Sequence, residues 1–140
     1  MSNYEEENID SGSVAGKSDA EYKQDISARE KEVAKFLNQG KPSEAIPIAL
    51  QDPPIYTKSQ AIKDQNSAVV VGLLGQVKEK DVDACVERLD ADQLDILMKY
   101  IYRGLATGDN SAIFFKWFEA TLKKGGIGSV VRAISERKTV

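Results

Sequence analysis

Hydrophobic positions repeat at helical spacing through most of this 140-residue chain. The plainest case is residues 94–105, where Leu94, Leu97 and Ile101 fall on one face of a helix that turns about 100° per residue. Further apolar side chains flank this face, so a helix here is apolar nearly all round and needs cover on most sides. Either it is the central element of a helical domain, or other chains complete its burial.

Aromatic residues gather in a second helical stretch, residues 113–118. Phe114 and Phe118 share one face of the expected helix, Phe115 lies beside them, and Trp117 extends the apolar arc round the side. Core packing explains most of this pattern. Trp117 is also a candidate anchor for a protein interface, because buried tryptophans often dominate binding energies.

Capping and breaking residues divide the remaining pattern into further helices. Ser27 and Glu30 match a capping box, so we expect a first helix to begin at Ser27 and to end at Gly40 in the left-handed conformation. No stretch alternates with a period of two for long enough to predict a strand. The pattern predicts an all-α fold of about seven short helices in an α-α superhelix. The expected starts or caps of four later helices are Ser43, Thr57, Asp90 and Asn110, and two further helices are expected from the apolar residues that begin with Val82 and with Ile127.

The N-terminal residues 1–26 differ from the rest in composition. They carry seven acidic residues against Lys17 and Lys23, a net charge of −5, which leaves +2 on the remainder because the whole chain has −3. Few apolar side chains occur here, so the segment cannot bury enough surface to offset the entropy lost on ordering. We expect an extended acidic arm at residues 1–26 and a helical domain at 27–140. The arm is either a solvated spacer or a segment that orders on a partner.

Catalytic chemistry finds little support in the sequence. The chain has no histidine, which removes the commonest general base and the commonest zinc ligand. Its single cysteine, Cys85, lies on a helical stripe and is interpreted as a small core residue. The glycines of residues 125–128 lack a preceding strand and a following lysine, so a turn between helices explains them better than a phosphate-binding loop. We expect no enzyme activity, no cofactor and no metal site.

Charge and hydropathy also restrict the partners. An acidic tail on a mildly basic body does not favour nucleic acid, which requires clustered lysine and arginine. No run approaches the roughly 18 apolar residues of a membrane span, and the first residues are acidic where a signal peptide would be basic. We therefore expect a cytoplasmic protein that contacts other proteins.

Three blocks of residues, 52–64, 97–104 and 125–132, together with the terminal residues 137–140, carry a resemblance to a known family. In order and spacing from about Glu32 onward, the chain resembles subunit 5, the small helical subunit of the actin-related protein 2/3 complex. This resemblance implies a helical subunit of a seven-membered assembly that nucleates branched actin filaments, located in the cytoplasm and cytoskeleton. It implies that the body packs on the β-propeller subunit and on subunit 4 of that complex.

For the arm, the resemblance implies a reach toward the actin-related protein 2 subunit, with residues 4–10 loosely matching the acidic arm of the family. A different hypothesis is a free-standing adaptor whose helices form a peptide-binding groove. The arm residues expected to contact a partner are Tyr4, Glu5, Glu6, Asn8, Ile9 and Asp10. The body residues expected to do so are Tyr100, Tyr102, Arg103, Trp117, Arg132 and Lys138.

Overall fold

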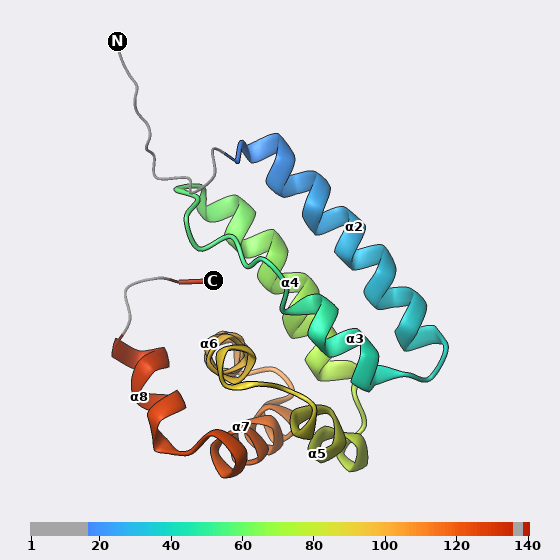
Figure 1. The fold of residues 1–140 in the computed structure, drawn as a ribbon, viewed down its shortest axis with the longest axis vertical. Coiled ribbons are helices and arrows are strands. Elements are labelled where there is room, and N and C mark those ends of the chain that lie inside the picture. Colours follow the sequence, from blue (N-terminus) through green and yellow to red (C-terminus); the bar gives the residue numbers. More distant parts are fainter. Residues whose placement is uncertain (1–16, 136–138) are drawn as a thin grey trace.

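A computed structural model describes residues 17–135 and 139–140, and this part of the chain is helical without a strand. The predicted all-α fold of seven helices is confirmed (Figure 1). Residues 1–16 lie outside the described residues, and with them most of the predicted arm. The helices are α2 (Asp19–Asn38), α3 (Pro42–Ala49), α4 (Gln60–Gln76), α5 (Glu79–Glu87), α6 (Ala91–Thr107), α7 (Ser111–Gly125) and α8 (Ile127–Ser135).

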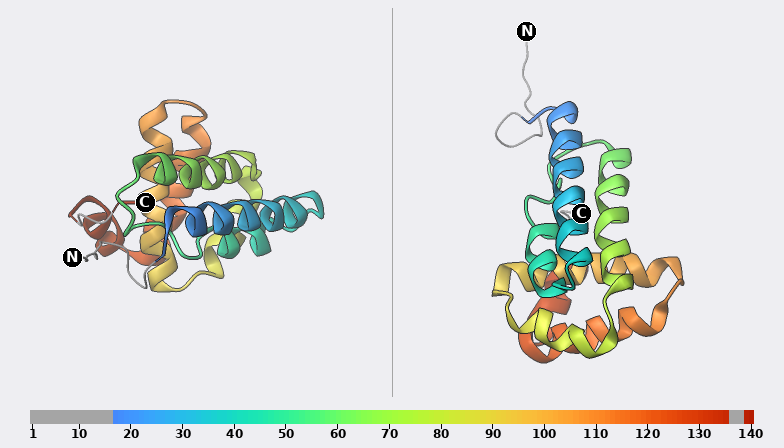
Figure 2. Two further views of the ribbon diagram at one scale, coloured as in Figure 1. Left: turned by 90° about the horizontal axis from the view of Figure 1, so that it is seen from above. Right: turned by 90° about the vertical axis from the view of Figure 1, so that its right-hand side faces the viewer.

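The helices form two groups with different directions. Figure 2 shows α2, α3 and α4 standing side by side, while α6 and α7 run across one end of them. Helix α4 joins the groups, because it packs on α2 and α3 and also on α6 and α7. Helix α8 covers a further side of α6, next to α7.

The predicted central helix is α6. Its side chains Leu97, Met98 and Ile101 have no exposed surface, and α4, α7 and α8 surround it. Of the two alternatives for this helix, the described residues support burial within the chain. Any surplus of apolar surface must therefore be sought on other helices.

The first helix begins earlier than predicted. Ser18, rather than Ser27, is the N-cap: its Oγ accepts from the Glu21 backbone N at 3.2 Å, and the Ser18 N donates to Glu21 Oε1 at 2.9 Å. Both serines begin the same motif, but Tyr22 and Ile26 are buried and continue the apolar stripe upstream of Ser27. Helix α2 therefore crosses the predicted boundary between residues 26 and 27.

Other helix starts shift by one or two residues from the prediction. Helix α4 is capped by Ser59, whose Oγ accepts from the Ile62 N at 3.3 Å, while Thr57 Oγ1 accepts from the Ser59 N and shapes the turn before it. Helix α3 begins at Pro42 instead of Ser43, since proline suits the first helical position, where no N–H partner is needed. The predicted cap Asp90 is confirmed, with a full capping box.

Candidate partner-docking face

The largest exposed apolar side chains of the described residues lie mainly on α8. Ile127 is 68 % exposed, Val131 52 % and Ile134 68 %, and their spacing of four and three residues places them on one stripe. We call this stripe the α8 face. A helix stripe left uncovered by the described residues is typical of a binding surface when several such side chains adjoin.

Two kinds of contact attach α8 to the body and leave the α8 face pointing outward. Val130 and Ser129 turn toward the core and are buried. Arg132 forms a two-pronged ion pair with Asp95 of α6, with Nε donating to Oδ2 at 2.7 Å and Nη2 to Oδ1 at 3.0 Å. Such paired contacts fix orientation as well as adding energy.

The glycine run before α8 serves as a turn, as predicted. Gly126 ends α7 with φ of 76°, a conformation that favours glycine. Its N donates to the Leu122 carbonyl at 2.8 Å, and its own carbonyl accepts from the Ser129 N at 3.3 Å. These amides are thus engaged in the turn that redirects the chain from α7 into α8.

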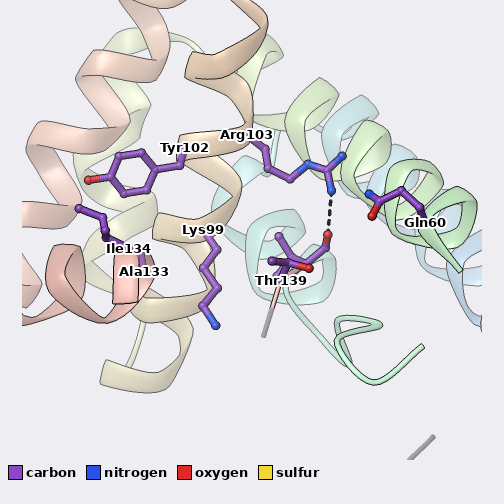
Figure 3. A pocket seen from close by; sticks show the side chains of 8 residues that line it. Gln60, Lys99, Tyr102, Arg103, Ala133, Ile134 and Thr139 are labelled. Carbon is purple, nitrogen blue, oxygen red and sulfur yellow. Dashed lines mark hydrogen bonds between the residues drawn. The ribbon is translucent and has the colours of Figure 1, made fainter. Parts of the chain in front are cut away.

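A hollow of about 370 Å³ adjoins the α8 face, and Ile134 belongs to both. Figure 3 shows its lining, in which Tyr102 and Lys99 come from α6 and Gln60 from the start of α4. Tyr102 packs edge to face on Phe118 of α7, with ring centroids 6.1 Å apart. The hollow is therefore mainly apolar, with polar groups at its border.

Arg103 organises the polar border of the hollow. Its Nη2 donates to Asp64 Oδ1 and its Nη1 to the Val140 backbone O, each at 2.8 Å. Hydrogen bonds from Gln60 and Arg103 lower the pKa of the Asp64 carboxyl. Lys63 donates to Thr139 Oγ1, and burial, together with the nearby Arg103 charge, lowers its pKa.

The predicted site residues divide into three groups. Tyr102 and Arg103 line the hollow, and Arg132 holds α8 on the body. Lys138 and the six predicted arm residues lie outside the described residues. Tyr100 and Trp117 are fully buried in this conformation, and a partner contact through either of them stays a prediction.

The polar atoms of both Tyr100 and Trp117 form hydrogen bonds inside the core. Trp117 Nε1 donates to the Leu74 carbonyl at 2.9 Å, which ties α7 to α4. Tyr100 Oη accepts from Asn66 Nδ2 at 2.6 Å, and Asn66 Oδ1 accepts from Arg29 Nη2 at 3.0 Å. Tyr100 and Trp117 therefore belong to the core of the helical body.

The sequence pattern did not identify the α8 face. Ile127, Val130, Val131 and Ile134 recur at helical spacing in the sequence, but only Val130 of these is buried. Phe115, expected beside the core face of its helix, is 60 % exposed. One feature of the sequence could have indicated the exposed face of α8. Its apolar residues cover a wide arc of the helix, and α6 and α7 alone cannot bury the whole of that arc.

Chemical reactivity finds little geometric support in the described part of the chain. Cys85 is fully buried, as predicted, and burial raises the pKa of its thiol. Among residues 17–135 and 139–140, no group of three or more His, Cys, Asp or Glu side chains is arranged to hold a metal ion. Nor does any helix within these residues have the length and apolar character needed to cross a membrane.

These features define a small all-α protein whose distinctive surface is suited to binding another protein. A family model for the ARP2/3 complex 16 kDa subunit (p16-Arc) matches residues 1–140. The chain belongs to this family.

Similar proteins are known in amoebae and vertebrates. The chain is 67 % identical over 138 residues, 99 % of each chain, to actin-related protein 2/3 complex subunit 5 of Dictyostelium discoideum. It is 40 % identical over 111 residues to the subunit 5-like protein of Mus musculus, covering 78 % of this chain and 72 % of that one. With subunit 5-B of Xenopus laevis it shares 38 % over 113 residues, 79 % and 74 % of the two chains. The resemblance inferred from the sequence is confirmed.

Proposed function

We propose that this protein is a non-catalytic structural subunit of an actin-related protein 2/3 complex, which nucleates branched actin filaments. Membership of the p16-Arc family supports the assembly. The single structural observation that carries a docking role is the α8 face, three adjoining aliphatic side chains more than half exposed. Its place of action is the actin cytoskeleton of the cytoplasm.

The helical body docks on sister subunits, the β-propeller subunit and subunit 4. The α8 face contributes apolar area to this docking, and Tyr102 and Arg103 in the adjoining hollow contribute polar selectivity. Burial of apolar surface supplies the binding energy, at roughly 25 cal/mol per Å² of area removed from water. The ion pair of Arg132 with Asp95 keeps α8 in place while its outer face is covered.

The N-terminal arm tethers the actin-related protein 2 subunit. Residues 4–10 contain four acidic residues together with Tyr4 and Ile9, a composition that suits a basic protein surface with apolar subsites. An arm joined to a docked body raises the local concentration of its weak site to roughly the mM range. Even a weak contact would then help to retain a mobile subunit in the complex.

The docking role is tested by replacing the α8 face in the assembled complex. The variant I127S/V131S/I134S removes the exposed apolar surface while leaving Val130 and Arg132 unchanged. We expect it to lose stoichiometric retention when the complex is purified through another subunit. The matched control A20S/A28S changes exposed positions of α2 and should be retained like the wild type. Full retention of the triple variant would remove the α8 face from the docking surface.

The tether is tested by altering the arm alone. Because Ser18 caps α2, the deletion should stop at residue 16 and leave the capping box intact. We expect the complex to lose actin-related protein 2 more readily during purification and to branch filaments less. A control arm of equal length made of Gly and Ser should behave like the deletion, since it lacks the acidic and apolar side chains. Unchanged retention and unchanged branching in both variants would exclude the tether.

A further inference from the structure

The surroundings of the α8 face are basic. Residues 123–135 carry three cations, Lys123, Lys124 and Arg132, and no acid, although Arg132 pairs with Asp95 and Lys124 with Glu87 of neighbouring helices. Lys99 and Arg103 line the adjoining hollow, where Arg103 pairs with Asp64, so the cations of the hollow and of residues 123–135 outnumber these acidic partners. An apolar centre with basic surroundings is complementary to an acidic segment that carries spaced apolar side chains.

A segment with that composition occurs in the same chain. Residues 1–16 contain Glu5, Glu6, Glu7 and Asp10 and no lysine or arginine. Tyr4 and Ile9 flank the acidic run. The arm thus matches the hollow and the α8 face in both charge and apolar content.

The arm also leaves the body close to the hollow. Thr57 Oγ1 donates to Asp19 Oδ1 at 3.4 Å, so the start of α2 adjoins the loop before α4. Gln60, which lines the hollow, lies three residues after Thr57, at most about 11 Å along the chain. The seven steps from Lys17 back to Asp10 span at most about 25 Å, which is enough to reach this wall.

We propose that, in the chain without its partners, residues 4–10 of its own arm cover the hollow and the α8 face. In this proposal the acidic side chains approach Lys99 and compete with Asp64 and Asp95 for Arg103 and Arg132, while Tyr4 and Ile9 cover apolar surface. A sister subunit that docks on the α8 face displaces the arm and frees it to bind elsewhere. Body docking and arm release are thereby coupled.

The expected strength of this contact is modest. A tethered segment has an effective concentration of roughly mM, so an intrinsic Kd of about 1 mM would leave the cover about half occupied. Such a contact shields the apolar face in the free protein and still yields to a partner that buries more surface. The inference rests on the proposed function only for the displacement step, since the cover itself is a property of the isolated chain.

The test uses the isolated full-length chain with a nitroxide label attached through Ser11→Cys. Cys85 is fully buried and does not compete for the label. We expect selective loss of NMR intensity for the methyl groups of Ile127, Val131 and Ile134. The methyl groups of Leu37, in the last turn of α2 and remote from its start, should keep their intensity.

The control variant E5Q/E6Q/E7Q retains the length and shape of the arm and removes three of its charges. We expect it to recover most of the lost intensity, as should high salt, which screens the contact. Uniform or absent broadening would overturn the proposal. Broadening that disappears when the nitroxide-labelled chain is diluted with chain that carries no nitroxide would also overturn the proposal. The arm of a second copy, and not the chain's own arm, would then cover the α8 face. Retention of actin-related protein 2 in the complex is a separate readout, so failure of the tether and failure of the cover can be told apart.

Discussion

At the scale of single residues, the closest fit in the core is between Gly104 of α6 and Phe114 of α7. A Cβ added at Gly104 would lie 2.4 Å from Phe114 Cε1, and the ring is itself buried. Overpacking of this kind typically costs about 1–3 kcal/mol. The absence of a side chain at position 104 therefore sets how closely α6 and α7 approach.

We predict that Gly104→Ala lowers the free energy of unfolding by about 1–3 kcal/mol, measured by urea denaturation. The matched control is Gly72→Ala, a helical glycine whose added Cβ would meet nothing within 4 Å. That variant should be about 0.5–1 kcal/mol more stable than wild type, because alanine loses less backbone entropy in a helix. Equal stabilities for the two variants would contradict the close packing of α6 on α7.

A second residue-scale feature is the buried chain of hydrogen bonds from Arg29 through Asn66 to Tyr100. It joins α2, α4 and α6, and burial raises the pKa of the Tyr100 hydroxyl to about 12 from an ordinary value of 10.0. The neutral phenol is therefore favoured in the folded state. The contribution of this neutral phenol to the free energy of unfolding is fully present below pH 10. It is lost as the pH rises toward 12, because the tyrosine of the unfolded chain ionises at lower pH than Tyr100 of the folded chain.

We predict that wild type loses about 1–3 kcal/mol more stability between pH 10 and pH 12 than Tyr100→Phe does. At neutral pH the variant should already be about 1–2 kcal/mol less stable, since Asn66 loses a buried partner. Urea denaturation at a series of pH values measures both effects. Parallel stability curves for the two proteins would show that the phenol titrates normally in the folded state.

At the scale of helices, the start of α2 offers a direct comparison of two identical-looking signals. We predict that Ser18→Ala costs about 0.5–2 kcal/mol, because Ser18 accepts from the first turn of the helix. Ser27→Ala should cost nothing and can raise stability by up to about 0.5 kcal/mol, since Ser27 is an exposed residue within the helix. Thermal unfolding followed by circular dichroism measures both. A larger loss of stability for Ser27→Ala than for Ser18→Ala would indicate that α2 begins at Ser27, the start expected from the sequence.

Helical periodicity explains how much of the fold could be predicted. The buried face of α6 and the cap at Asp90 were predicted because local sequence determines both. The start of α2 was not, because two capping motifs compete and the choice depends on where Tyr22 and Ile26 find neighbours. Local rules place a cap, whereas tertiary contacts select among candidate caps.

The candidate site was less predictable for a related reason. Periodicity shows that a residue lies on an apolar face, but it does not show whether another element covers that face. Trp117 was a candidate interface anchor and is buried, whereas Ile127 and Ile134, which periodicity alone does not distinguish from core residues, are exposed. Exposure depends on how far α6 and α7 extend beneath α8, which is a property of the assembled chain.

At the scale of the whole molecule, the apolar helix α6 is buried by other helices of the same chain, whereas α8 keeps apolar side chains exposed. Helix α4 holds the two helical groups together and α6 is enclosed, so the body completes its own core. Among the described residues, the exposed large apolar side chains that remain are those of the α8 face, beside the hollow, and Phe115 of α7. The isolated chain should therefore be folded but prone to associate through the α8 face.

We predict that the isolated full-length chain self-associates weakly as its concentration is raised, because monomers rarely leave adjoining apolar side chains uncovered. Deleting residues 1–16 should shift association to lower concentration, since the acidic arm no longer competes for the α8 face. The variant I127S/V131S/I134S should stay monomeric with or without the arm. Sedimentation velocity over a concentration series separates the three proteins. A strictly monomeric wild type and arm deletion would instead fit a free-standing adaptor, because a subunit that depends on neighbours to cover α8 must show that face when they are absent.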